Sequence, residues 1–197
     1  MSHFNDEAAN WDDEGKVKMM KLLASQAMKV LKPQNDISIM DFGCGTGLFG
    51  LEFTDHAKSL LGIDTSEGML EVFDKKTQGH DNFTSKNIDL ESENLDQKFD
   101  LIVSSMAFHH LTNPYDVLVK FKSMINEGGK IAIVDLDKED GSFHPDNEGM
   151  GVKHFGFSKQ ELESWASDAQ LKMEHHFINE IEKNDNNYKQ FLAVYSV

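Results

Sequence analysis

The sequence contains no arginine, a single cysteine (Cys44) and only three prolines among its 197 residues. Without arginine, the chain has no guanidinium group to hold a phosphate or carboxylate in bidentate fashion. Its 34 acidic residues outnumber 19 lysines and leave a net charge of −15, which repels nucleic acids and anionic membrane surfaces. One cysteine cannot form an internal disulfide, which fits a reducing compartment.

Long apolar runs are also missing. The longer ones, such as 131–134 and 191–195, fall far short of the ~20 residues that a membrane-spanning helix requires. No signal-peptide pattern opens the chain. We therefore expect a soluble, cytoplasmic protein, monomeric or homodimeric, that binds neither nucleic acid nor membrane. It is expected to fold as one domain over residues 1–197.

The apolar residues between about positions 12 and 31 recur at the spacing of an amphipathic helix. Asp12 or Asp13 is available to cap the N-terminus of this helix, and Pro33 ends it. We predict a helical N-terminal cap over about residues 1–32.

Strand and helix patterns then alternate along the chain. Strands are expected at 37–42, 59–63, 83–88, 99–104 and 130–135, and helices at 48–54, 66–77 and 115–125. This alternation is typical of an α/β fold with a doubly wound, mostly parallel sheet and helices on both faces. A long loop over about 136–157 follows, and loops of that length are usually functional or disordered. A helix at 158–168 and strands at 171–181 and 188–197 are expected to end the chain in an antiparallel hairpin.

A glycine-rich turn, Asp41-Phe42-Gly43-Cys44-Gly45-Thr46-Gly47, lies where the first expected strand meets the first expected helix. Ligands of open α/β sheets bind at such junctions, and glycines let them lie against bare backbone. The spacing of Gly45, Gly47 and Gly50 also matches the dinucleotide-binding pattern GxGxxG, which is weak evidence alone. A carboxylate at Asp41 would repel a pyrophosphate but attract the ammonium and sulfonium groups of S-adenosylmethionine (SAM). The turn therefore favours SAM over NAD.

Two further acids follow the next two strands. Asp64 closes the second strand, so its carboxylate is expected beside the same crevice, where it can accept the ribose hydroxyls of either cofactor. Asp89 follows the third strand and can accept the exocyclic amine of an adenine. Its apolar neighbours Ile88 and Leu90 are candidates to flank the adenine face.

Four ordered motifs resemble those of class I SAM-dependent methyltransferases, specifically the small-molecule branch of that family. They are DFGCGTG from Asp41, GIDTSEGML from Gly62, FDLIVSSMAFHHL from Phe99 and the EGG turn at Glu127, and they cover about residues 36–135. The resemblance implies a Rossmann-like, seven-stranded sheet with an antiparallel last strand. It also implies that the N-terminal cap and the loop at about 136–157 cover the substrate. The SAM-binding residues that it implies are Asp41, Gly43, Gly45, Gly47, Asp64, Thr65, Met69, Ile88, Asp89, Leu90 and Ser105.

The reaction implied by the resemblance is methyl transfer from SAM to an oxygen, nitrogen or sulfur atom of a small metabolite. Alignment of the reactants can supply most of the acceleration, and a base is needed only when the attacking atom is still protonated. His110 and His154 are our candidate bases, because a free imidazole titrates near neutral pH. Family members with different substrates also carry a pair like His109-His110, so one of the two can simply shape the pocket.

Carboxylates and histidines after the fifth expected strand offer the ligand types of a divalent metal site, but no tight ligand spacing supports one. These residues are Asp135, Asp137, Asp140, His144 and His154. We predict no metal site. Two other functions stay open at this point: a SAM-binding module without catalysis, which would bind SAM without turnover, and an NAD(P)-linked oxidoreductase, which would prefer NADH.

Overall fold

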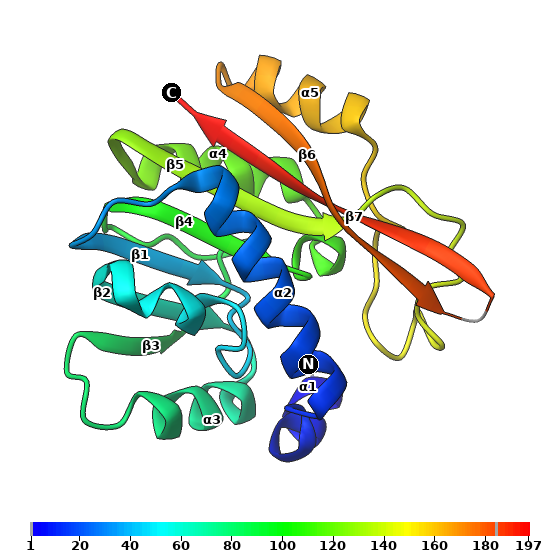
Figure 1. Cartoon of the computed structure of the whole chain (residues 1–197), viewed down its shortest axis with the longest axis horizontal. Helices are drawn as coiled ribbons and strands as arrows, with labels where there is room; N and C mark the ends of the chain where they lie inside the picture. Colours follow the sequence, from blue (N-terminus) through cyan, green and yellow to red (C-terminus); the bar gives the residue numbers. More distant parts are fainter. Residues whose placement is uncertain (1, 184) are drawn as a thin grey trace.

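The computed structural model, which describes residues 2–183 and 185–197, contains one seven-stranded sheet with the order β3-β2-β1-β4-β5-β7-β6 (Figure 1). The strands are β1 (Ile37–Phe42), β2 (Ala57–Asp64), β3 (Phe83–Asn87), β4 (Phe99–Ser105), β5 (Ile125–Leu136), β6 (Lys172–Lys183) and β7 (Asn186–Ser196). Strands β1 to β5 pair in parallel, whereas β7 runs antiparallel to both of its neighbours, β5 and β6. The predicted seven-stranded, mostly parallel sheet with an antiparallel last strand is confirmed.

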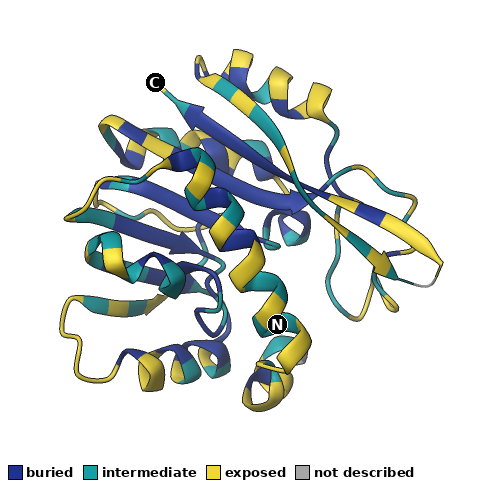
Figure 2. Ribbon diagram, viewed as in Figure 1, coloured by how far each residue is buried: buried dark blue, intermediate teal, exposed yellow. Residues whose placement is uncertain are grey.

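Helices cover both faces of this sheet, as predicted. They are α1 (Ser2–Glu7), η1 (Ala8–Asn10), α2 (Glu14–Leu31), η2 (Gly50–His56), α3 (Glu67–Thr77), η3 (Phe108–His110), α4 (Pro114–Met124) and α5 (Lys159–Asp168). Successive strand residues point to opposite faces of the sheet. Ile39 of β1 therefore packs in the core between the sheet and helices α2 and α3, and Met40 in the core between the sheet and helices α4 and α5. The central strands are accordingly buried along most of their length (Figure 2).

Two elements differ from the sequence prediction. The helix expected at 48–54 is the 3₁₀ helix η2, which begins at Gly50. Strand β5 begins directly after α4, because Phe99 pairs with Ile125 and Leu101 next pairs with Lys130. The intervening residues 126–129 bulge out of the ladder, and Gly128 within them has a φ of +76°. The turn that separates the expected helix from the expected strand is therefore a bulge inside the strand.

The N-terminal helix and the loop after β5 are each fixed by local contacts. The backbone amide of Lys16 donates to Asp13, so Asp13 caps α2, while Asp12 makes other contacts. A bridge between Asp137 and Phe157 closes the base of the loop. Across the residues that the structure describes, no helix has the length and apolar character needed to cross a bilayer.

Candidate functional site

The glycine-rich turn after β1 adopts backbone conformations that favour glycine. Gly43, Gly45 and Gly47 have φ values of +64°, +52° and +86°, in the left-handed region. A Cβ atom on Gly43 would lie 2.4 Å from the Cβ of Ala107, so this glycine is also required for packing. A Cβ on Gly45 would meet nothing within 4 Å. The backbone at Gly45 is thus open on the side where a side chain would stand, as a ligand lying against it requires.

Asp64, at the end of β2, connects this turn to the start of α3. Its Oδ2 accepts a hydrogen bond from the Gly45 amide at 2.8 Å, and its Oδ1 accepts one from the Ser66 amide at 2.9 Å. Burial raises the pKa of Asp64, against the lowering effect of the neighbouring backbone amides. An ionised carboxylate has about four lone-pair sites, so roughly two remain for donors such as ribose hydroxyls. Next to it, Thr65 is exposed and Met69 is buried.

Asp41 is buried beneath the turn. Its Oδ2 accepts a hydrogen bond from the Gly50 amide at 3.1 Å, and a Cβ on Gly50 would lie only 2.2 Å from that oxygen. Burial raises the pKa of Asp41 to about 8, although the Gly50 amide lowers it; the Asp64 charge raises it further. The carboxyl group therefore holds its proton at neutral pH in the free chain, whereas its residue type alone predicts an anion. A cation bound nearby would favour its ionised form.

The raised pKa of Asp41 makes a stability prediction with a definite sign. The folded chain binds this proton more tightly than the unfolded chain, so the group's stabilising contribution is lost as pH rises from about 4 to about 8. Asp41→Asn removes the titration, so its melting temperature relative to the wild type should rise by at least about 2–4 °C between about pH 5 and pH 8.5. Thermal unfolding at both pH values, with the exposed Asp96→Asn as control, measures this difference. A difference that does not change with pH would contradict the raised pKa.

The predicted cofactor residues at the ends of β3 and β4 contact other groups of the protein itself. Oxygens of the Asp89 carboxylate accept hydrogen bonds from the Glu91 amide at 2.9 Å and the Ser92 hydroxyl at 3.1 Å, inside its own turn. Ile88 and Leu90 are both buried in the core beside α4. Ser105 is buried as well, and its hydroxyl contacts the Met20 sulfur of α2 at 3.6 Å. Their predicted roles toward the cofactor stay predictions.

The N-terminal cap is bonded directly to the glycine turn and to α3. Asn5 Oδ1 accepts from the Ser66 hydroxyl at 2.6 Å and from the Gly68 amide at 3.1 Å. Asp12 Oδ1 accepts from the Thr46 hydroxyl at 2.5 Å, and Asp12 Oδ2 lies 2.6 Å from the ammonium of Lys76. The sequence predicts this segment as a cover, but the contacts of Asn5, Asp12 and Lys76 could not be predicted, because no spacing pattern relates positions that are 34 to 64 residues apart along the chain.

The candidate bases occupy different environments. His110 lies beside His109, with ring centroids 4.1 Å apart, whereas the ring of His154 packs against Phe157 at 5.3 Å. Burial, followed by the His109 charge, lowers the pKa of His110 to about 3. A group with so low a pKa is a weak proton acceptor at neutral pH. His110 and His154 are linked through the neighbouring residue His109, whose backbone oxygen accepts a hydrogen bond from the His154 amide.

His109 is anchored to the end of β5. Its Nδ1 lies 2.7 Å from Asp135 Oδ1, and its backbone amide donates to Asp135 Oδ2 at 3.2 Å. Both side chains are buried within the described structure. His144, from the loop after β5, approaches His109 with ring centroids 5.0 Å apart. Burial is the largest cause that lowers the pKa of His144, to about 4, so this imidazole is neutral at neutral pH.

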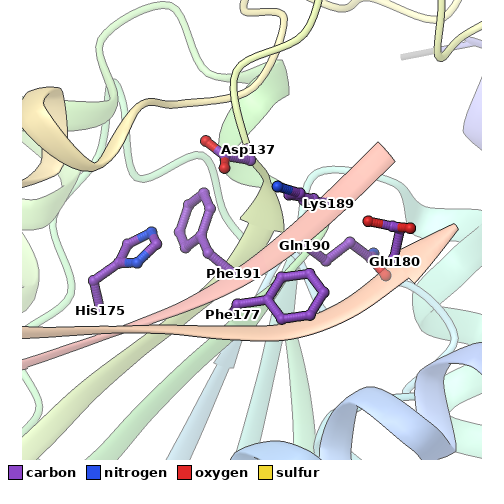
Figure 3. Close-up of a pocket in the computed structure, with 7 residues that line it drawn as sticks. All are labelled: Asp137, His175, Phe177, Glu180, Lys189, Gln190 and Phe191. Carbon is purple, nitrogen blue, oxygen red and sulfur yellow. The ribbon is translucent and has the colours of Figure 1, made fainter. Parts of the chain in front are cut away.

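A hollow of about 320 Å³ lies elsewhere, over β6 and β7 (Figure 3). Its lining includes Asp137, His175, Phe177 and Lys189 and none of the predicted cofactor residues. The predicted cofactor residues, Gly45 and Asp64 among them, thus lie outside the lining of this hollow.

The sequence is similar to those of methyltransferases. A family model described as a methyltransferase domain matches residues 14–176. An uncharacterized methyltransferase of Schizosaccharomyces pombe is 30% identical over 160 residues, which cover 70% of this chain and 54% of that protein. A ubiquinone biosynthesis O-methyltransferase of Coxiella burnetii is 25% identical over 138 residues, which cover 66% of this chain and 58% of that protein. These alignments thus span only 54% and 58% of the two relatives.

Solved structures share the fold at lower sequence identity. A methyltransferase in complex with the Trm112 methyltransferase activator of Haloferax volcanii has a TM-score of 0.79 and 17% identity, covering 98% of this chain and 96% of that one. DhpI in its SAM–HEP complex has a TM-score of 0.76 and 16% identity, covering 100% of this chain and 95% of that one.

Proposed function

Because this chain belongs to the class I SAM-dependent methyltransferase family, we propose that it binds SAM beside Gly45 and Asp64 and transfers its methyl group to a small molecule. The observation that carries this proposal is the bond between the Gly45 amide and the Asp64 carboxylate, next to backbone that is open at Gly45. This hydrogen bond places the open backbone at Gly45, which would contact the amino-acid part of the cofactor, next to the Asp64 carboxylate, which would accept hydrogen bonds from its ribose.

SAM, when bound, supplies an electrophilic methyl group and a neutral thioether leaving group. The chain's contribution is then to hold the cofactor, align the acceptor and exclude water. Asp64 would fix the ribose, and ionised Asp41 would add a negative charge near the cationic cofactor. The cap would cover the site through the bonds of Asn5 and Asp12. None of these roles requires a histidine base.

Charge and the relatives support a small molecule as the acceptor. A net charge of −15 without any arginine disfavours nucleic acids and phosphorylated acceptors. The Coxiella relative is named as an O-methyltransferase of ubiquinone biosynthesis, which supports an oxygen atom of a small molecule as the acceptor. A nitrogen or sulfur acceptor is compatible with the same cofactor geometry.

The proposal is tested by measuring S-adenosylhomocysteine (SAH) release from SAM in the presence of small phenols, carboxylic acids, amines and thiols. We expect acceptor-dependent release of SAH by the wild-type chain and its loss in Asp64→Asn at a SAM concentration below saturation. SAM binding without turnover on any acceptor would favour the non-catalytic SAM-binding module instead.

A further inference from the structure

Three histidines converge at the carboxyl ends of β4 and β5. His109 and His110 belong to η3, directly after β4, and His144 belongs to the loop after β5. Each offers one ring nitrogen, and the three nitrogens lie within 4.8 Å of one another. The sequence offers a different set of ligand types, the acids and histidines from Asp135 to His154, and its ligand spacing predicts no site. The structure instead groups His144 with His109 and His110.

Each of these three rings has one nitrogen that lacks a partner in the described structure. His109 Nε2, His110 Nδ1 and His144 Nδ1 are buried atoms with no hydrogen bond. Leaving a buried polar nitrogen unpaired costs free energy, and such groups call for an explanation. Three unpaired nitrogens on three adjacent rings are consistent with a shared ligand that satisfies all of them.

Asp135 sets the chemical form of His109. Because a carboxylate accepts hydrogen bonds, the 2.7 Å contact with Asp135 Oδ1 places the imidazole proton on Nδ1. A neutral His109 then has its lone pair on Nε2, the atom without a partner. A carboxylate behind a histidine is the usual arrangement that orients a metal-binding imidazole and raises its basicity.

We propose that His109, His110 and His144 bind one divalent transition-metal ion of the zinc type, with Asp135 orienting His109. Three imidazoles and one open position form a common coordination set for Zn²⁺. Zn–N bonds of about 2.0–2.1 Å place tetrahedral ligand nitrogens about 3.3 Å apart, so the half-buried rings of His110 and His144 must rotate inward on binding. Mg²⁺ and Ca²⁺ prefer oxygen ligands and do not fit this set.

The position of the cluster suggests a use for the ion. The ring of Phe4, in the cap, lies 5.3 Å from the ring of His110, so the cluster is next to the element that covers the cofactor site. A metal ion lowers the pKa of a hydroxyl group bound in its open position. An acceptor hydroxyl bound in that position would thus lose its proton more readily. This use rests on the proposed methyl transfer, whereas metal binding itself does not.

The test is a calorimetric titration of the chelator-treated, tag-free full chain with Zn²⁺, in the absence of SAM. We expect one ion to bind per wild-type chain. Replacing a group behind a ligand typically weakens binding by about 10- to 100-fold, so loss of a ligand in His144→Ala should cost at least about 100-fold. His80→Ala, whose exposed ring stacks on Phe83, is the matched control and should bind like the wild type.

Two additional measurements separate the loss of a metal ligand from the loss of the fold. Circular dichroism establishes that each variant is folded, and His110→Gln serves as a second ligand variant. Co²⁺ bound in place of Zn²⁺ should give the visible absorption of a tetrahedral site in the wild type and lose it in both ligand variants. Equal Zn²⁺ affinity in the wild type, His144→Ala and His110→Gln would overturn the proposal, as would the absence of Zn²⁺ binding. Because SAM is left out, neither result depends on the proposed methyl transfer.

Discussion

Replacing Asp64 with asparagine should weaken the binding of SAM and of SAH by about 10- to 100-fold. Asp64 already accepts hydrogen bonds from the Gly45 and Ser66 amides through its two oxygens. An asparagine has one oxygen, so its NH₂ group would face one of these N–H donors and could not accept a ribose hydroxyl. Hydrogen bonds to a charged group contribute about 1.5–3 kcal/mol each, which corresponds to the expected loss.

Isothermal titration calorimetry of both ligands measures this effect. SAM and SAH share the ribose, so the two affinities should fall by a similar factor. Asp96→Asn makes the same chemical change at an exposed position and should leave both unchanged. An undiminished SAH affinity in Asp64→Asn would remove Asp64 from the ribose site.

Replacing Asp135 with alanine should lower the free energy of unfolding by about 3–5 kcal/mol, because leaving one buried hydrogen-bond donor without its acceptor costs about 1–3 kcal/mol and three donors would lose Asp135. Asp135 is fully buried and accepts hydrogen bonds from His109 Nδ1 at 2.7 Å, the His109 amide at 3.2 Å and the Leu136 amide at 2.7 Å. Alanine leaves all three donors without this acceptor. Urea denaturation, monitored by circular dichroism, measures the loss.

Asp137→Ala is the matched control for this change. Asp137 lies two residues further along and is only partly buried, so its substitution should alter the free energy of unfolding by less than about 1 kcal/mol. Asp135→Asn should lie between the two, since the amide oxygen retains one acceptor. If Asp135→Ala and Asp137→Ala were equally stable, the buried contact with His109 would not stabilise the fold.

The order of helices and strands could be predicted from the sequence because it depends on local signals. Alternating strand and helix patterns determine the order of elements, and the left-handed conformations of Gly43, Gly45 and Gly47 follow from a residue type that tolerates positive φ. The family resemblance adds the strand count and the antiparallel β7. The sheet confirms the seven strands and the antiparallel direction of β7.

Contacts between distant segments could not be predicted in the same way. Nothing in the spacing of Asp12 and Thr46 indicates that their side chains meet, and the same holds for His109 and Asp135. Burial is equally hidden: Asp41 is expected to be an anion from its residue type, yet burial raises its pKa to about 8. Ligand spacing along the chain also does not reveal that the loop after β5 brings His144 next to His109 and His110 of η3.

The most direct test of the central claim compares SAM, SAH and NADH as ligands of the wild-type chain by titration calorimetry under one set of conditions. Our account predicts that SAM and SAH each bind with one site per chain and that NADH produces no binding signal. Binding of NADH together with no binding of SAM or SAH would contradict it.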